Sequence, residues 1–438
     1  MRVGIIIGRI GGVDGVALET EKWITVLEEM GHDIYVATGN LKSDIKNVVV
    51  VPEMDFHHPL VIREQDDAFY KQKIKEETLI KRIDRLSSHI EKEIIKRLEK
   101  NKIDVIISEN ASALPCHLSM GLAIKNVVDK TSIPIICHDH DYAWERKGRY
   151  DTKYKFVKNL IKECFPLKEK YVKRAVINTY AKNTIKKKFN LESIVVPNVM
   201  DFRKEYGNKD EFNKTLPKTL GLNGKDINLF QVTRIVRRKG IEVAINLISE
   251  LDDPNIKLII TGGTNDDHNA DYYGELVDLI DSLDLNERVI FAHNYFDNFR
   301  RIGKHLVDDL SLGQIKKSNF HSRVYSLTDC YAHAEAVTYF SSYEGFGNAF
   351  IEAVQSRTPV FVNNYEPVYW PDIGSLGFKT VMIEKNKLTS NAISDIKKVL
   401  YNKKLGTEMA EYNYKLGEKH FSYKVLKCCL EKLFMELQ

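Results

Sequence analysis

The chain has 438 residues, more than one hydrophobic core usually serves, so two domains of about 200 residues each are expected. Hydrophobic residues make up 43% of the chain and charged residues 29%, and no apolar run approaches the roughly 18 residues that span a bilayer, which argues against an integral membrane protein. The net charge of +4 comes without a recognised nucleic-acid-binding module, so no nucleic-acid partner is expected.

The first part of the chain alternates short runs rich in Val and Ile with helical stretches. The runs are VGIIIG (3–8), DIYVAT (33–38), NVVVVP (47–52), IDVIISE (103–109), PIICHD (134–139), AVINT (175–179) and SIVVP (193–197). This pattern is typical of buried parallel strands in a βα fold. Apolar residues also keep helical spacing from Ile74 to Leu98, which predicts a long amphipathic helix.

A polar stretch without periodicity, residues 206–226, separates this series from a second one. The second series comprises INLFQVT (227–233), KLIITGG (257–263), RVIFAH (288–293), AVTYFSS (336–342), TPVFVNN (358–364) and KTVMIE (379–384). Two doubly wound α/β domains in tandem are therefore predicted. Ligands of such sheets bind beyond the carboxyl ends of the strands, so the loops that follow strands are the candidate sites.

The six cysteines show no CxxC spacing, and a chain of this size needs no disulfide bonds, so a cytoplasmic location is expected. The run MRVGIIIG is too short for the core of a signal peptide and is interpreted as the first strand. The sequence gives no indication of the oligomeric state.

One segment, residues 146–188, is strongly basic: it has 15 Lys and Arg against 3 Asp and Glu, a net charge of +12, which leaves −8 for the rest of the chain. The simplest interpretation is a solvated helical face. The alternatives are contact with an anionic membrane surface or with an anionic substrate.

A glycine-rich loop, GRIGGVDG (8–15), follows the first predicted strand, so its backbone N–H groups could approach a phosphate or a sugar. Its spacing is not GxGxxG, and the second strand ends in ATGN (37–40) without the acidic residue that would hold a ribose. The absence of a GKS or GKT sequence excludes a P-loop. The alternative is that these glycines only form a tight turn.

Basic side chains follow the first strand of the second series. In TRIVRRKGIE (233–242), Arg234 and Lys239 are five positions apart, with Arg237 and Arg238 between them. Fixed cations at the end of a strand suit a diphosphate.

The stretch CHDHDYAWERKGRY (137–150) also follows a predicted strand. The residues His138 to Asp141 are candidate metal ligands, but their spacing is not that of a zinc site. Hydrogen bonds to polar substrate groups are therefore favoured, with a structural histidine as the alternative. The nearby Arg146, Lys147 and Arg149 could bind a carboxylate or a phosphate of an acceptor.

The stretch SSYEGFGNAFIEA (341–353) places Glu344 in a turn and Glu352 early in a helix whose cap is expected near Asn348. Free N–H groups at the helix start favour an anion, and carboxylates suit hydroxyl groups, so a ligand with phosphates and hydroxyls is indicated. The alternatives are a pair of glycosidase carboxylates and a capped helix with a solvated acid. Two glutamates on one loop and helix are poorly placed to face each other across a substrate.

EGFGNAFIEA, with seven residues between its two glutamates, resembles the signature of retaining glycosyltransferases of family 4, which have the GT-B fold. Other motifs that resemble the family, in the same order, are GRIGGV, VPNVMDF, TRIVRRKG, TDCYAHAEAVTYFSSYEGFG and EKHFSYKVLKCCLEKLF (418–434). The resemblance covers most of the chain. It implies an α/β GT-B fold with two Rossmann-like, doubly wound parallel-sheet domains, over 1–200 and 201–415, that face a central cleft. A C-terminal helix over 416–438 would cross back to the first domain.

The resemblance also implies transfer of a hexose from a nucleotide sugar, GDP-mannose or UDP-glucose, with retention of configuration. Arg234 and Lys239 would stabilise the diphosphate, while His138 and Glu344 would contact the donor sugar. The other candidate donor-binding residues are Gly11, Gly12, Gly263, Gly345, Phe346, Gly347, Asn348 and Glu352, the last on the nucleotide ribose. The candidate acceptor-binding residues are Asn110, Arg146 and Arg149. No bound cofactor and no metal ion are expected.

Two features depart from the family pattern. The segment 294–327 is unusually long, and its role is open. The stretch VNNYEPVYWPDIGSLGF (362–378), with HDHDYAWER, is similar to relatives that build small glycosides, including mannosylglucosylglycerate as a compatible solute, which favours a small anionic acceptor. One alternative is a membrane-associated transferase with a lipid or polysaccharide acceptor, docked through the segment 146–188. Another is a sugar-nucleotide binding protein without turnover.

Overall fold

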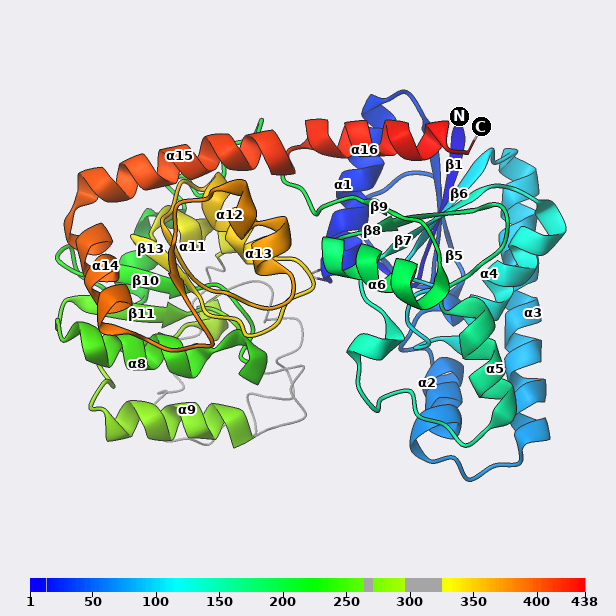
Figure 1. Ribbon diagram of the computed structural model, residues 1–438, viewed down its shortest axis with the longest axis horizontal. Coiled ribbons are helices and arrows are strands. Elements are labelled where there is room, and N and C mark those ends of the chain that lie inside the picture. The colour runs from blue at the N-terminus through cyan, green and yellow to red at the C-terminus, as the bar shows by residue number, and fades with distance from the viewer. Residues whose placement is uncertain (13, 264–270, 296–324, 438) are drawn as a thin grey trace. The chain divides into compact units, whose positions relative to one another are not determined.

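The computed structural model describes residues 1–12, 14–263, 271–295 and 325–437 (Figure 1). The chain divides into a first unit, residues 1–199 with 423–438, and a second unit, residues 200–422. Most of the segment 294–327, to which the sequence assigns no role, lies outside the described residues. Each unit is built around its own parallel sheet.

The first unit contains a parallel sheet in the order β5-β3-β1-β6-β7-β8-β9. Its strands are β1 (Arg2–Ile7), β3 (Asp33–Thr38), β5 (Val48–Val50), β6 (Val105–Glu109), β7 (Ile135–Asp139), β8 (Val172–Val176) and β9 (Ile194–Val195). Each strand overlaps one predicted Val- and Ile-rich run. A separate pair, β2 (Ile10–Gly11) with β4 (Leu41–Lys42), extends the loop after β1. The strand order reverses between β1 and β6, where a doubly wound sheet binds its ligands.

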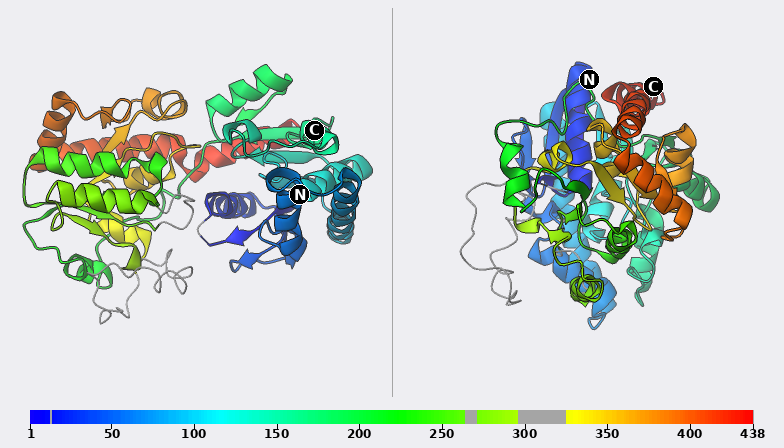
Figure 2. Two further views of the ribbon diagram at one scale, coloured as in Figure 1. Left: turned by 90° about the horizontal axis from the view of Figure 1, so that it is seen from below. Right: turned by 90° about the vertical axis from the view of Figure 1, so that its left-hand side faces the viewer.

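Helices cover both faces of this sheet (Figures 1 and 2). They are α1 (Gly15–Glu29), α2 (Pro59–Gln65), α3 (Glu76–Asn101), α4 (Leu118–Thr131), α5 (Lys155–Cys164), α6 (Thr179–Phe189) and α16 (Tyr423–Met435). One apolar core lies beneath α3, α4 and α5, and another beneath α1 and α16. The long amphipathic helix predicted from Ile74 to Leu98 is α3, whose apolar stripe is buried.

The second unit contains a parallel sheet in the order β12-β11-β10-β13-β14-β15. Its strands are β10 (Ile227–Gln231), β11 (Ile256–Ile260), β12 (Val289–Phe291), β13 (Ala336–Tyr339), β14 (Val360–Asn363) and β15 (Val381–Ile383). Its helices are α7 (Leu216–Thr219), α8 (Ile241–Leu251), α9 (Asp271–Ser282), α11 (Leu327–Ala332), α12 (Asn348–Gln355), α13 (Tyr369–Asp372), α14 (Ser390–Tyr401) and α15 (Lys403–Phe421). The switch point here lies between β10 and β13.

The C-terminal helix expected over residues 416–438 is interrupted. Helix α15 ends at Phe421 and α16 begins at Tyr423, because Ser422 is extended, with φ −89° and ψ 166°. Ser422 forms a β-bridge with Met200, whose N–H donates to the Phe421 carbonyl at 2.8 Å. This pairing with a distant segment replaces one turn of helix. Within the described residues, no helix combines the length and apolar character needed to cross a bilayer.

Candidate active site

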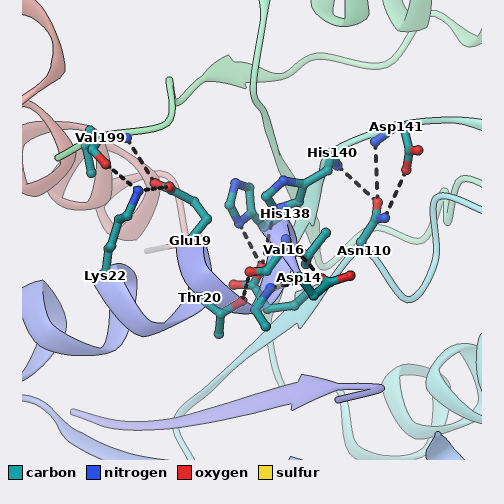
Figure 3. A network of polar contacts seen from close by, with 12 residues as sticks. Asp14, Val16, Glu19, Thr20, Lys22, Asn110, His138, His140, Asp141 and Val199 are labelled. Atoms are coloured by element: carbon teal, nitrogen blue, oxygen red, sulfur yellow. Dashed lines mark hydrogen bonds and ion pairs between the residues drawn. The ribbon is translucent and has the colours of Figure 1, made fainter. Parts of the chain in front are cut away.

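The carboxyl ends of β6 and β7 bring a carboxylate and two imidazoles together in the first unit. Figure 3 shows the two imidazoles, His138 and His140. Glu109 ends β6 and is paired in register with His138 of β7, so their side chains point to the same face of the sheet. The Glu109 Oε2 atom lies 2.8 Å from Nδ1 of His138 and 3.7 Å from Nε2 of His140. All three side chains are buried.

Burial and neighbouring charges act in opposite directions on this group. Burial disfavours the Glu109 carboxylate, but His138 and His140 stabilise it more and lower the pKa of Glu109 to about 2. Burial also disfavours the charged form of His140, but Glu109 and nearby acids raise the pKa of His140 above its ordinary value. The group is therefore an ionised carboxylate held between two imidazoles.

The ring of Trp23, from α1, stacks on His138 with 4.0 Å between ring centroids and 22° between ring planes. Three buried polar atoms of the group have no hydrogen-bond partner among the described residues: Glu109 Oε1, His138 Nε2 and His140 Nε2. Leaving such atoms unmatched costs about 1–3 kcal/mol each. The group therefore suits a ligand that carries polar hydrogens, which fits the predicted role of His138.

The glycine-rich loop follows β1 in the same unit. Gly11 has φ +86°, and an added Cβ would lie 2.4 Å from the Lys42 carbonyl carbon, so only glycine fits there. No atom of the described residues lies within 4 Å of an added Cβ on Gly12, which leaves its backbone accessible from that side. Asp14 accepts two N–H groups of the first turn of α1, at 3.1 and 3.2 Å. A contact of this loop with phosphate or sugar would therefore come from Gly11 and Gly12 rather than from the capped helix.

The three candidate acceptor residues lie in the loops after β6 and β7. Asn110 accepts the His140 N–H at 3.0 Å and donates to Asp141 at 3.0 Å, so its amide already holds the two loops together. Arg146 forms an ion pair with Asp141. Arg149 is exposed, with its guanidinium carbon 5.7 Å from the ring centroid of Tyr150, and it forms no ion pair with any carboxylate that the structure describes. Arg149 is thus the candidate whose charge no acidic side chain balances.

The basic segment 146–188 is not one solvated face. Its Arg174 is buried and forms an ion pair with Asp139, which also accepts the Tyr142 hydroxyl at 2.8 Å. These three side chains stabilise the interior of the first unit. The contact of this segment with an anionic membrane stays a prediction.

In the second unit, two cations enclose one carboxylate beyond the ends of β10 and β13. The Lys239 ammonium contacts Oε1 of Glu344, and Nη1 of Arg238 lies 2.8 Å from Oε2. Burial disfavours the Glu344 carboxylate, but Lys239 and Arg238 lower the pKa of Glu344 to about 2. The ring of Tyr339 lies 5.6 Å from the Lys239 ammonium. The group carries a net positive charge, which suits an anion.

The loops after β10 and β11 meet at the same end of this sheet. The Ile235 N–H donates to the Gly263 carbonyl at 2.9 Å, and Arg234 beside it is exposed. Three predicted residues, Arg234, Lys239 and Gly263, therefore lie in neighbouring loops beyond the strand ends. The exposed guanidinium of Arg234 is suited to a diphosphate.

The glycine-rich turn before α12 is supported by Tyr365, from the distinctive stretch 362–378. Its hydroxyl donates to the Phe346 carbonyl at 2.7 Å, and an added Cβ on Gly347, whose φ is +150°, would lie 2.3 Å from that hydroxyl. Gly347 caps α12, next to Asn348, where the cap was expected. The Phe346 side chain is buried against Phe421, so a donor could use its backbone but not its ring.

Glu352 is held by a tyrosine. The Tyr331 hydroxyl, from α11, donates to Glu352 Oε2 at 2.8 Å. The ring of Tyr206 lies 5.6 Å from that of Tyr331. Because one carboxylate oxygen is fixed in this way, the orientation of Glu352 is set, and its lone pairs can accept hydroxyl groups.

Comparisons with known proteins agree with this architecture. Residues 212–298 match the family model Glycosyl transferases group 1. Over 413 residues the chain is 29% identical to the mannosylglucosylglycerate synthase of Petrotoga mobilis, covering 87% of this chain and 86% of that protein. It is 28% identical over 450 residues to the mannosylglucosylglycerate synthase of Thermotoga maritima, with 99% of each covered. The chain is a glycosyltransferase with a group 1 domain over residues 212–298.

The fold of this glycosyltransferase is GT-B. The sucrose-phosphate synthase of Thermosynechococcus elongatus superposes with a TM-score of 0.63 over 100% of this chain and 98% of that chain, at 14% sequence identity. Group 1 glycosyltransferases take nucleotide sugars as donor substrates, which agrees with the cationic end of the second sheet.

Within the described part of the glycosyltransferase, Glu109, His138 and His140 bring their ligand atoms within 4.8 Å of one another, close enough for a metal ion. Imidazole and carboxylate ligands suit zinc and iron. However, one potential ligand atom of Glu109 and one of His138 are already used in a direct hydrogen bond of 2.8 Å between the two side chains. That the site works without a metal stays a prediction.

Four residues of these groups were missed by sequence analysis of the glycosyltransferase: Trp23, Glu109, Arg238 as a partner of Glu344, and Tyr331. Glu109 did carry a signal, since it is a charged residue at the end of a buried apolar strand, where an acid needs a partner. The others gave none, because each makes its contact with a residue of another element that the local pattern does not identify.

Proposed function

We propose that the protein transfers a hexose, mannose or glucose, from GDP-mannose or UDP-glucose to a small anionic acceptor of the glycerate glycoside type, with retention of the anomeric configuration. The names of the two relatives support an acceptor and product of this kind. The arrangement of charges in each unit supports the assignment of donor and acceptor contacts.

The donor diphosphate would bind Arg234 and Lys239, because negative charge grows on it as the glycosidic bond breaks. Glu344 holds the Lys239 ammonium in place, so little reorganisation is needed when that charge appears. Glu352, oriented by Tyr331, would accept hydrogen bonds from the ribose hydroxyl groups. His138 and the backbone of the glycine-rich turns would contact the sugar and phosphates.

The proposal of an anionic acceptor rests on the surroundings of Arg149. It presents an exposed guanidinium in the loop after β7 that no described carboxylate neutralises, whereas Asp141 neutralises Arg146. A guanidinium binds a carboxylate through two parallel hydrogen bonds. Arg149 is therefore suited to the carboxylate of a glycerate group.

A donor panel tests the proposed reaction. Purified protein is incubated with GDP-mannose, UDP-glucose, other nucleotide sugars and the free nucleotides. We expect one donor to raise the melting temperature, through binding to the folded state, and to be hydrolysed slowly. Addition of a glycerate glycoside should accelerate nucleotide release. If no donor stabilises the protein or is consumed, the proposed function is wrong.

Replacement of Arg149 tests the acceptor. We expect Arg149→Ala to raise the KM of the acceptor about tenfold or more, because hydrogen bonds to charged groups contribute about 1.5–3 kcal/mol. The donor KM should not change. Steady-state kinetics with each substrate varied in turn gives both constants.

Lys147→Ala is the matched control, because it removes the same charge from the same loop. An equal rise of both KM values in Arg149→Ala, or an equal effect of Lys147→Ala, would contradict the assignment. Arg146→Ala should have a smaller effect, since Asp141 already balances that charge.

A further inference from the structure

We propose that Glu109 is a positioning residue that holds the His138 imidazole in the tautomer with its proton on Nδ1, so that Nε2 accepts a hydrogen bond from a hydroxyl group of the donor sugar. The inference rests on the proposed function, in which His138 contacts that sugar. It assigns a role to Glu109 that the motifs of the chain do not indicate.

The direction of the bond between Glu109 and His138 follows from the charge of the carboxyl group. A glutamate side chain is ordinarily ionised at neutral pH, and the Glu109 carboxylate faces two imidazoles, so it has no proton to donate. The 2.8 Å contact between Oε2 and Nδ1 is therefore one in which the imidazole Nδ1–H donates. The proton of a neutral His138 is thereby assigned to Nδ1, and its Nε2 carries a lone pair.

Glu109 is the one acidic side chain of this group whose ion-pair partners are both imidazoles. The other carboxylates near the imidazoles are paired with cations: Asp14 with Arg9, Glu19 with Lys22, and Asp141 with Arg146. Glu109 has only the two imidazoles as ion-pair partners among the described residues. One carboxylate balances one buried imidazolium, and two imidazolium groups here would leave one charge without a partner, which is costly.

Two contacts fix the plane of the His138 ring. Glu109 holds Nδ1 on one edge, and Trp23 stacks on one face at 4.0 Å. The Nε2 atom on the opposite edge is buried and has no partner among the described residues. An acceptor nitrogen fixed in this way matches a hydroxyl donor, and a sugar is rich in hydroxyl groups.

The tautomer can be measured directly. Long-range proton–nitrogen NMR correlation spectra of the full chain, labelled with nitrogen-15 histidine, distinguish the two tautomers and the imidazolium. The His138→Gln variant identifies the signals of His138 by their loss. We expect the wild-type protein to show His138 protonated at Nδ1 alone near pH 7, and Glu109→Gln to show a mixture of forms. Wild-type His138 protonated at Nε2 would overturn the inference.

Kinetics then separates positioning from a purely structural role. We expect Glu109→Gln to lower kcat about 10- to 100-fold, as for loss of one hydrogen bond to a charged group. Glu64→Gln is the matched control: Glu64 is also buried in the first unit, but its carboxylate accepts from Ser119, away from His138.

In a His138→Ala background, Glu109→Gln should change kcat less than threefold, because the two residues act as one unit. Independent, multiplicative losses would contradict the proposal.

Metal analysis and the donor panel complete the test. One equivalent of a divalent metal in the purified wild-type protein, lost in Glu109→Gln, would overturn the proposal, because Glu109 would then be a metal ligand. Absence of turnover with every nucleotide sugar would overturn the proposed function instead. The tautomer measurement needs no substrate, so it tests the role of Glu109 in either case.

Discussion

Replacement of Arg234 by alanine is expected to lower kcat with the nucleotide-sugar donor about 10²- to 10³-fold, the loss that follows removal of one fixed stabilising group. Arg234 is exposed beyond the end of β10, beside the loop that carries Gly263, and it is proposed to contact the diphosphate where charge develops. Because the lost interaction is strongest in the transition state, kcat should fall more than the donor KM rises. Turnover under saturating donor measures this effect.

Arg237→Ala is the control for this variant. Arg237 is three positions along the same loop, but its side chain points to Glu275, and both side chains are 51% exposed. Its replacement removes the same charge and should leave kcat within about twofold, since exposed ion pairs contribute little. Thermal melting of both variants checks that they are folded. If Arg234→Ala and Arg237→Ala behave alike, Arg234 does not contact the diphosphate.

Much of the fold could be predicted because its signal is local. Buried parallel strands appear in the sequence as continuous Val- and Ile-rich runs, and each of these runs overlaps a strand of one of the two sheets. The pair of β2 and β4 was missed, since two residues per strand give no periodicity. The break at Ser422 was missed for a different reason: its cause is the bridge to Met200, which is far away in the sequence.

The candidate site could be predicted only as a set of residue types at strand ends. The motif around Glu344 indicated a carboxylate near cations, but not that Lys239, 105 positions earlier, would contact it. The HDHD stretch indicated a polar site at His138, while the residue that fixes its proton, Glu109, comes from the neighbouring strand. Register between strands and pairing between loops set these contacts, and neither can be read from one stretch of sequence.

The second large effect is expected on stability. Replacement of Glu344 by glutamine should lower the free energy of unfolding by about 3–5 kcal/mol at pH 7, because Lys239 is left buried without a counter-charge. The same estimate follows from titration: a carboxyl whose pKa falls from 4.5 to about 2 on folding contributes about 3 kcal/mol when ionised. Urea unfolding at pH 7 measures the difference. Glu275→Gln, which breaks an exposed pair in the same unit, should cost less than about 1 kcal/mol.

The pH dependence of the free energy of unfolding distinguishes loss of the Lys239–Glu344 ion pair from a packing defect. The pKa of Glu344 is lowered on folding, so its stabilisation is fully present above the unfolded pKa of 4.5 and is lost as the pH falls toward about 2. The stability gap between wild-type protein and Glu344→Gln should therefore be constant from pH 7 to about 5 and shrink by about half at pH 3, by roughly 1.4 kcal/mol per pH unit. A cavity or a strained side chain would leave the same gap at every pH. A stability gap that does not change between pH 7 and pH 3 would mean that the Lys239 and Glu344 charges do not stabilise the fold. The proposal that Glu344 holds the Lys239 ammonium in place for the diphosphate would then be wrong.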